Sequence, residues 1–371
     1  MNVLYTIQTH GPGGAESVIV NLAKCFNNDH WRAHGFFLTD GWIADEFRRN
    51  SLPVEVSNSK WLLDIPLLLS LVSYVRKHSI SVMHAHEFYM GFYCGLVSAI
   101  TGIPCITTYH GKSPYSLERR IRYLAFKQSL KRTLPVAVSH DLENWIVSNY
   151  RVPPDRVRVV HNGIDAAAFV RGTRDRNDCR SHILDLIGAP EESVLVATVA
   201  RLFPVKGVKY LVEAASIVHK GCPSVHFVVA GDGPDRPALE ALVTQEGLAA
   251  YFHFLGECGF VPRVLCASDM FVLPSNSEEL SISILEALAS RLPVIATDVG
   301  DNRYLIQEGR NGFLVPKQRP ELLAERIQYL LDRRDLWTTM GKESESIVAG
   351  SFSNEAMIEK YRELYENARK G

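Results

Sequence analysis

Short runs of β-branched and other apolar residues alternate with longer amphipathic segments along nearly the whole chain. Alternating strands and helices are typical of parallel sheets built from βαβ units, so the sequence predicts an α/β protein. Because twisted open sheets rarely exceed about 10 strands, we expect two doubly wound, Rossmann-like domains. Strands are expected near 3–7, 34–40, 81–86, 105–110, 134–139 and 157–162, and again near 193–200, 225–230, 251–255, 270–274, 293–298 and 312–315.

A chain of 371 residues is long enough for two domains of this kind. Between Asp165 and Glu192 the apolar periodicity gives way to a polar stretch, which we interpret as a linker. The last residues have apolar positions at helical spacing and predict a terminal helix. The expected parts are an N-terminal domain, a linker, a C-terminal domain and a C-terminal helix, at 1–170, 171–190, 191–352 and 353–371.

Composition and charge exclude several classes of protein. The chain is 46% hydrophobic and 22% charged, which is ordinary for a globular protein, and its formal net charge of −1 gives no global attraction to nucleic acid. The 7 cysteines are scattered and contain no C-x-x-C, as expected in a reducing compartment. No signal peptide is apparent, and no apolar stretch reaches the ~18–20 residues of a spanning helix. We therefore expect a cytoplasmic protein.

A glycine-rich turn, GPGGAE at 11–16, follows the first expected strand and opens a helix. Gly13 and Gly14 would let backbone N–H groups approach an anion at the helix N-terminus. Glu16 stands where the third glycine of G-x-G-x-x-G would be, which weakens a dinucleotide-binding interpretation. A tight turn without a ligand remains the alternative.

Two cations follow the first expected strand of the second half. Arg201 and Lys206 are spaced R-x4-K, with Gly207 next and a helical pattern after it. Cations between a strand end and a helix N-terminus suit a diphosphate and can stabilise its departure without a metal. The sequence contains no D-x-D, the common arrangement for holding a divalent ion on a nucleotide diphosphate. Solvated surface charge is the alternative.

Two carboxylates, Glu278 and Glu286, lie eight residues apart after an expected buried strand. With Glu278 in the loop and Glu286 in the first helical turn, loop amides and both carboxylates would converge on one polyhydroxylated ligand. Two other interpretations remain open. Ser283-x-x-Glu286 is also a capping-box pattern, and Glu278 is also consistent with a solvated loop acid.

Histidines end two apolar runs of the first half, as H-A-H at 84–86 and as T-Y-H-G at 108–111. At strand ends they could donate hydrogen bonds to hydroxyls or act as acid and base. His110, which precedes a glycine, is the stronger candidate, whereas structural roles for His84 and His86 stay open. No third ligand follows a suggestive spacing, so we expect no metal site.

A basic segment, 117–132, has apolar residues at helical spacing and six basic residues. Such a helix is suited to an anionic membrane surface, and a solvated helix face is the alternative. In the second half, Gly231 opens a G-D-G-P sequence that predicts a turn first and a ligand contact second.

The order of these motifs along essentially the whole chain resembles the retaining glycosyltransferases of family 4, which have the GT-B fold. The pair of R-x4-K and E-x7-E is the specific part of the resemblance. It implies a metal-independent enzyme that moves a sugar from a UDP- or GDP-sugar to a hydroxyl acceptor with retention, in the synthesis of surface polysaccharide or glycolipid. It further implies an acceptor-binding first domain, a donor-binding second domain and a terminal helix that crosses back to the first.

The resemblance also assigns roles to single residues. Arg201 and Lys206 would hold the donor diphosphate, Glu286 the ribose hydroxyls and Glu278 the transferred sugar. His110 would lie beside the reacting sugar, as the phosphate oxygen that leaves accepts the acceptor's proton. The remaining donor or acceptor contacts would come from Gly13, Gly14, Gly231, Glu279, Leu280, Ser281 and Ile282.

Two positions depart from the family pattern. Glu279 and Arg291 each replace a usual glycine, and Glu279 would alter the sugar-binding loop if that position needs a positive φ. Two alternatives stay open: a nucleotide-sugar epimerase or hydrolase on the same fold, and a catalytically silent nucleotide-sugar-binding subunit, which Glu279 and the basic segment 117–132 suggest. The expected partners are a nucleotide-sugar donor, a carbohydrate or lipid-linked acceptor and, through 117–132, the inner face of the plasma membrane, with no nucleic acid.

Overall fold

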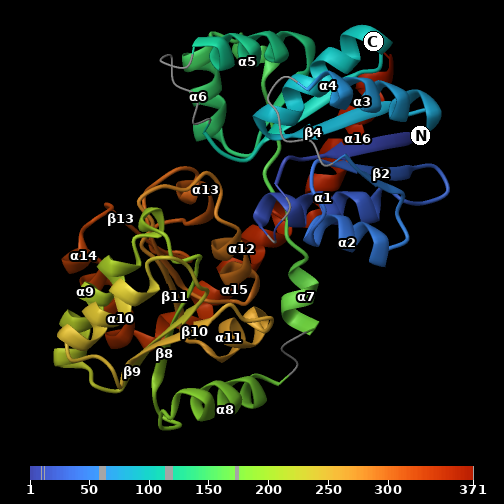
Figure 1. Ribbon diagram of the computed structural model, residues 1–371. Coiled ribbons are helices and arrows are strands. Elements are labelled where there is room, and N and C mark those ends of the chain that lie inside the picture. The colour runs from blue at the N-terminus through green and yellow to red at the C-terminus, as the bar shows by residue number, and fades with distance from the viewer. Residues whose placement is uncertain (10, 12, 58–63, 113–119, 172–174, 371) are drawn as a thin grey trace. The chain divides into compact units, whose positions relative to one another are not determined.

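A computed structural model describes the chain except for residues 10, 12, 58–63, 113–119, 172–174 and 371 (Figure 1). The chain forms two compact units. Unit 1 comprises Met1–Gly163 together with Asn354–Gly371, and unit 2 comprises Ile164–Ser353. Each unit is a parallel sheet with helices packed on it, which confirms the predicted α/β class (Figure 1).

Unit 1 contains a seven-stranded sheet in the order β3-β2-β1-β4-β5-β6-β7. All its strand pairs are parallel, and β1 lies between β2 and β4. Its strands are β1 (Asn2–Thr6), β2 (Arg32–Phe37), β3 (Val54–Val56), β4 (Val82–His86), β5 (Cys105–Tyr109), β6 (Leu134–Ala137) and β7 (Arg158–Val159). Its helices are α1 (Gly14–Cys25), α2 (Trp42–Arg49), α3 (Ile65–Lys77), α4 (Glu87–Thr101), α5 (Arg120–Arg132), α6 (His140–Tyr150) and α16 (Asn354–Lys370).

The two faces of this sheet bury different side chains. Along β1, Val3 and Tyr5 join the cluster formed with α1, α2 and α16, whereas Leu4 joins the cluster formed with α3 and α4. This alternation is the two-residue period of a strand that is covered on both faces. The C-terminal helix therefore belongs to the core of unit 1, where Tyr361 and Tyr365 are buried.

Unit 2 contains a six-stranded parallel sheet in the order β10-β9-β8-β11-β12-β13. Its strands are β8 (Val194–Val199), β9 (Val225–Ala230), β10 (Phe252–Gly256), β11 (Met270–Leu273), β12 (Val294–Thr297) and β13 (Gly312–Val315). Its helices are α7 (Ala166–Arg171), α8 (Arg176–Ile187), α9 (Val208–Gly221), α10 (Arg236–Gln245), α11 (Val261–Ala267), α12 (Ile282–Ala289), α13 (Asn302–Leu305), α14 (Pro320–Asp332) and α15 (Trp337–Ser351).

The linker predicted at 171–190 is wrong for most of its length. Residues 172–174 lie outside the described part of the chain, but the rest of the polar stretch forms α8, which begins after the N-cap Asp175. Cys179, Ile183 and Leu184 are buried in the core of unit 2. Because many polar residues surround this narrow apolar stripe, the sequence looked structureless here. The chain instead passes between the units at Gly163 and Ile164.

The strand order reverses once in each sheet, between β1 and β4 in unit 1 and between β8 and β11 in unit 2. Every expected strand region contains an observed strand, and the structure adds the short edge strand β3. In open parallel sheets, ligands bind outside the carboxyl ends of the strands at this switch point. The residues that follow β8 and β11, and those that follow β1 and β4, are therefore the ones to examine.

Candidate functional site

The turn after β8 carries both predicted cations. Pro204–Lys206 form a single 3-10 turn, and Gly207 then adopts φ 62 as the N-cap of α9. A Cβ on Gly207 would lie 2.3 Å from the carbonyl oxygen of Pro274, which follows β11. Glycine is therefore required at position 207, because two loops approach each other closely here. One loop follows β8, and the other follows its neighbour β11.

This approach brings Lys206 and Glu278 together. Lys206 Nζ lies 2.7 Å from Oε1 and 2.9 Å from Oε2 of Glu278. The Glu278 side chain is only 8% exposed, and Ser275 Oγ donates a hydrogen bond of 2.6 Å to its Oε1. Glu278 is therefore not a solvated loop acid. Ser275 was missed as a site residue, although its position three residues before Glu278 was readable in the sequence.

Arg201 lies differently from Lys206. Its residue is exposed, and its guanidinium lies 5.4 Å from the centroid of the Phe203 ring. Leu202 between them is fully buried, and its backbone N–H bonds to the Asp232 carbonyl at 2.9 Å, which anchors the start of the turn. The structure thus places an exposed cation and a paired cation on the same short turn.

Helix α12 shows that the capping-box interpretation of Glu286 is wrong. The N-cap is Ser281, whose Oγ accepts the Ile284 N–H, whereas Ser283 already lies inside the helix. Glu286 consequently lies in the second helical turn and not in the first, too far along the helix to satisfy the N-cap amide. Burial raises the pKa of its carboxyl to about 7. A largely buried carboxyl without a capping role is a candidate ligand group.

The loop between Glu278 and α12 is held by the segment after β12. The Glu279 carbonyl accepts the Asp301 N–H at 2.8 Å, and a Cβ on Gly300, whose φ is 54, would lie 2.1 Å from the Glu278 carbonyl oxygen. Glu279 is not among the non-glycine residues with positive φ, so the backbone strain expected from its replacement of glycine is absent at this described position. Arg291 is among them, with φ 59.

Two of the predicted donor-contact residues, Leu280 and Ile282, have side chains that pack in the hydrophobic core of unit 2. Leu280 is buried in the hydrophobic cluster of unit 2, and Ile282 packs against the same cluster. Only their backbone groups are left for a ligand. Gly231, with φ 142, comes so close to β8 that a Cβ would lie 2.0 Å from the Ala200 carbonyl oxygen. Its glycine is thus explained by packing, as the turn interpretation predicts.

In unit 1, His110 is paired with His86. His86 Nδ1 lies 2.9 Å from His110 Nε2, and the two ring planes are nearly parallel, at an interplanar angle of 14°. His84 is instead fully partnered, since Tyr365 Oη lies 2.6 Å from its Nδ1 and Thr108 Oγ1 lies 2.8 Å from its Nε2. Burial lowers the pKa of His84 to about 3 and that of His110 to about 4. His84 therefore has the structural role, and His110 remains the candidate.

The glycine-rich turn before α1 contains the carboxylate of Glu16 from the same helix. Gly13 is the N-cap of α1, and a Cβ there would lie 2.5 Å from Oε2 of Glu16. The buried Glu16 side chain thus folds back over the N-cap, where its negative charge complements the positive end of the helix dipole. Sequence reasoning used Glu16 only to argue against a third glycine, although an acid three residues after the N-cap is the usual signature of such a fold-back.

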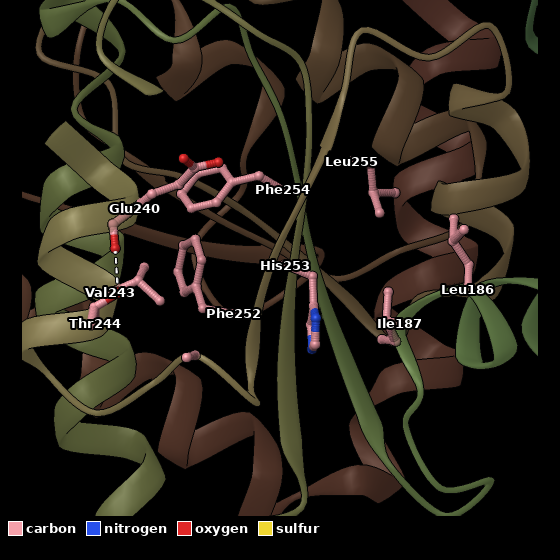
Figure 2. Close-up of a pocket in the computed structure, with 10 residues that line it drawn as sticks. Leu186, Ile187, Glu240, Val243, Thr244, Phe252, His253, Phe254 and Leu255 are labelled. Carbon is pink, nitrogen blue, oxygen red and sulfur yellow. Dashed lines mark hydrogen bonds between the residues drawn. The ribbon is translucent and has the colours of Figure 1, made fainter. Parts of the chain in front are cut away.

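A pocket of about 520 Å³ lies elsewhere in unit 2 and includes none of the predicted site residues. It surrounds the edge strand β10, with Phe252 and Phe254 directed toward α10 and His253 and Leu255 toward α8 (Figure 2). Its lining is mostly apolar, and we assign it no role in the chemistry.

The other predictions about ligands concern metal and membrane. Among the described residues, no group of three or more His, Cys, Asp or Glu side chains is arranged to hold a metal ion. No helix within the described ranges is both long and apolar enough to cross a bilayer. The basic segment 117–132 falls partly outside the described residues, and its described part forms α5, where Lys131 and Arg132 are exposed.

Comparisons with known proteins agree with this geometry. The model of Glycosyltransferase Family 4 matches residues 12–168, and that of Glycosyl transferases group 1 matches residues 183–346. The chain is 27% identical over 337 residues to the UDP-Gal:alpha-D-GlcNAc-diphosphoundecaprenol alpha-1,3-galactosyltransferase of Escherichia coli, covering 88% of this chain and 86% of the relative. It is 29% identical to the alpha-D-kanosaminyltransferase of Streptomyces kanamyceticus, covering 76% of each chain.

Solved structures show the same fold at lower sequence identity. Anabaena HepE in complex with UDP superposes with a TM-score of 0.87 at 22% identity, covering 99% of this chain and 100% of HepE. A glycosyltransferase from Rickettsia africae superposes with a TM-score of 0.90 at 19% identity, covering 100% of this chain and 99% of that one. The predicted GT-B fold is thereby confirmed, and the chain is a glycosyltransferase that belongs to family 4, the glycosyl transferases group 1.

Proposed function

We propose that this chain transfers a sugar from a UDP- or GDP-sugar to a hydroxyl acceptor, with retention of configuration and without a metal ion. The observation that carries the proposal is the Lys206–Glu278 pair at the switch point of unit 2. A cation beside a carboxylate matches a nucleotide sugar, in which a diphosphate is joined directly to a polyhydroxylated ring.

The division of labour follows from charge. Arg201 and Lys206 attract the diphosphate and stabilise the negative charge that develops as it leaves. Glu278 accepts hydrogen bonds from hydroxyls of the transferred sugar, and Glu286 accepts those of the ribose. The bond between the sugar and the phosphate breaks as the bond to the acceptor oxygen forms on the same face, and the departing phosphate oxygen takes the acceptor's proton.

The relatives support the choice of substrates. The Escherichia coli relative is named for a UDP-galactose donor and a lipid diphosphate acceptor. Anabaena HepE has been solved with UDP-glucose. On this basis we propose that the chain acts in polysaccharide or glycolipid assembly on the cytoplasmic side of the membrane, in peripheral contact with anionic lipid through 117–132. Flotation with anionic liposomes tests that contact, and absence from the floated fraction at low salt would contradict it.

The test of function is a donor screen by thermal shift, followed by turnover. A ligand at ~100 times its Kd stabilises a protein by ~2.7 kcal/mol, so UDP- and GDP-sugars are compared at equal concentration. Turnover with the binding donor and a panel of hydroxyl acceptors should persist in EDTA, and NMR of the product should show the donor's anomeric configuration. Inversion, or loss of turnover in EDTA that added Mg²⁺ restores, would contradict the proposal.

The two alternatives give different results in the same assay. An epimerase or hydrolase consumes donor without acceptor, and a silent subunit binds donor without turnover. The silent subunit was suggested by Glu279 and by the basic segment 117–132, and the absence of a positive φ at Glu279 removes the first of these reasons.

A further inference from the structure

His86 and His110 share one hydrogen bond between two neutral rings. Their facing nitrogens, Nδ1 of His86 and Nε2 of His110, lie 2.9 Å apart. Burial lowers the pKa of His110 to about 4 and that of His86 well below its usual value, so each ring carries a single proton at neutral pH. One of the two protons lies in the shared hydrogen bond. The two outer nitrogens must therefore differ, one being an N–H and the other a lone pair.

These outer nitrogens are Nε2 of His86 and Nδ1 of His110, and both are buried without a hydrogen-bond partner among the described residues. Buried polar atoms are normally hydrogen-bonded, so a bound group that pairs with these two nitrogens would satisfy them. His86 is fully enclosed, with 0% of its surface exposed, whereas His110 is partly exposed. An orphaned buried N–H is rarer than an orphaned acceptor. The outer N–H is thus favoured on His110, the less enclosed of the two residues.

The backbone of His110 is held from the same strand end. Its N–H donates to Glu87 Oε1 at 3.2 Å, and Glu87 directly follows His86 at the start of α4. Glu87 has φ 67, a left-handed conformation that residues other than glycine rarely adopt. Strained residues of this kind persist where the surrounding structure fixes them, and they cluster at functional sites. His86 at the end of β4 and Glu87 directly after it therefore contact the ring and the backbone of His110, respectively.

We propose that His86 is a positioning residue of the transfer reaction, which fixes the tautomer of His110 so that His110 Nδ1–H donates a hydrogen bond to an oxygen of the bound substrate. The inference rests on the proposed function. In this tautomer His110 Nδ1 is already protonated and cannot accept a proton. His110 then acts as a hydrogen-bond donor, and the acceptor's proton goes to the leaving phosphate.

Nitrogen NMR tests the tautomer directly and needs no substrate. In protein labelled with ¹⁵N-histidine, the His110 signals are assigned by their loss in His110→Asn. We expect the Nδ1–H form in the unmodified protein and a mixture of both tautomers in His86→Leu. An Nε2–H form in the unmodified protein would overturn the proposal, as would an unchanged single tautomer in His86→Leu. Because the first measurement needs no variant at position 86, the test survives misfolding of His86→Leu.

Kinetics separates positioning from a merely structural role. We expect His86→Leu to lower kcat by about 10–100-fold, the range seen when a group that orients a ligating histidine is removed. KM for the donor should change less than about threefold, since the hydrogen bond is worth most in the transition state. His86→Asn keeps a hydrogen-bonding amide at the position of Nδ1. Its decrease in log kcat should therefore be less than half of the decrease in His86→Leu. Equal losses in the two variants would contradict the proposal.

A matched control exists in unit 2, where His226 Nδ1 lies 3.1 Å from His253 Nε2 and the rings stack at 12°. His226→Leu removes a similar histidine pair and should leave both kcat and the His110 tautomer unchanged. A loss of kcat in His226→Leu equal to that in His86→Leu would show that the effect is structural. If the unmodified protein turns over no donor, the proposed function fails, whereas the NMR result still decides whether His86 fixes the tautomer of His110.

Discussion

Lys206 Nζ lies 2.7 Å and 2.9 Å from the two carboxylate oxygens of Glu278, a residue 72 positions further along the chain. The Glu278 side chain is 8% exposed, and the Lys206 side chain is 24% exposed. A charge pair this sheltered is held in place before any ligand arrives. It also couples the two residues, so that removing one changes the environment of the other.

This coupling predicts non-additive kinetics. We expect Lys206→Ala and Glu278→Gln each to lower turnover by about 100–1000-fold, on the scale of losing one preorganised charged group. The double variant should lose much less than the product of the two single losses, because each partner is already misplaced in the other's absence. Measurement of kcat/KM around the full cycle checks this. Strictly multiplicative losses would contradict a shared role.

Arg201→Ala should lower turnover by a similar ~100–1000-fold with little change in stability, since Arg201 is exposed and its guanidinium lies over the Phe203 ring at the surface. Turnover and thermal unfolding of the same preparation provide the two readings. Arg303→Ala, which removes an exposed cation paired with Asp298, is the matched control and should keep full activity. Full turnover in Arg201→Ala would remove Arg201 from the donor site.

Glu286 predicts that donor binding depends on pH. Its carboxyl has a pKa of about 7, and hydroxyls bind the ionised form better, so the Kd for UDP or GDP should fall as pH rises from 5.5 to 8. Calorimetric titration across this range measures the effect. Glu286→Gln cannot ionise, and its Kd should vary less with pH. Parallel pH profiles for the two proteins would contradict the assignment.

The Glu286 carboxyl should strengthen donor binding as pH rises, but it should lower the stability of the folded protein over the same range. Because its pKa is raised in the folded state, the folded protein binds more protons than the unfolded chain between the usual pKa of 4.5 and about 7. The contribution of this carboxyl to the free energy of unfolding is therefore full below its pKa in the unfolded chain. It decreases as the pH rises through that window. Relative to the wild type, Glu286→Gln should gain about 1–3 kcal/mol between pH 4.5 and 8. Urea unfolding at several pH values provides the comparison.

Arg291 at the end of α12 predicts a stabilising substitution. Its φ of 59 favours glycine, and its guanidinium also forms an exposed ion pair with Glu345. We expect Arg291→Gly in a Glu345→Ala background to raise the free energy of unfolding by about 1 kcal/mol, because the background has already lost the ion pair. Denaturant unfolding of both proteins measures it. A decrease would show that the side chain stabilises the helix end in another way.

The sequence indicated the α/β fold and the positions of the site loops for a physical reason. Buried parallel strands are continuous apolar runs, and polar residues that directly follow them must lie at one edge of the sheet. Arg201 follows β8 and Glu278 follows the turn after β11, so their loops were expected to meet. That β8 and β11 are neighbours came from the sheet order, which single-strand patterns do not specify.

The errors have local causes. Ser281 and Ser283 are both suitable N-cap residues, the glutamate three positions after Ser283 pointed to the wrong one, and only the backbone decides which serine begins the helix. The stripe of Cys179, Ile183 and Leu184 was hidden by the charged residues around it. The fold-back of Glu16 and the pairing of His86 with His110 depend on side-chain directions that no spacing rule supplies.

The stability of α8 depends on one carboxylate. Asp269 is 9% exposed and accepts hydrogen bonds from Arg176, Arg180 and the Leu195 N–H. We expect Asp269→Ala to destabilise unit 2 by about 1–3 kcal/mol, because the buried Leu195 N–H loses its acceptor and the two arginines, which also donate to backbone carbonyls, lose one partner each. Asp335→Ala breaks an exposed pair with Arg333 and should change stability by less than ~0.5 kcal/mol. Denaturant unfolding of both variants tests the contrast.

The position of α16 in unit 1 has a consequence for how the protein is made. Unit 2 is one continuous segment, Ile164–Ser353, and its sheet is complete before the last residues are synthesised. Unit 1 needs Met357, Tyr361 and Tyr365 for its core, so it cannot close while those residues are still inside the ribosome. The half of the protein that is translated first therefore completes its core only after α16 has emerged, and until then the apolar side chains that α16 covers are left for chaperones to shield.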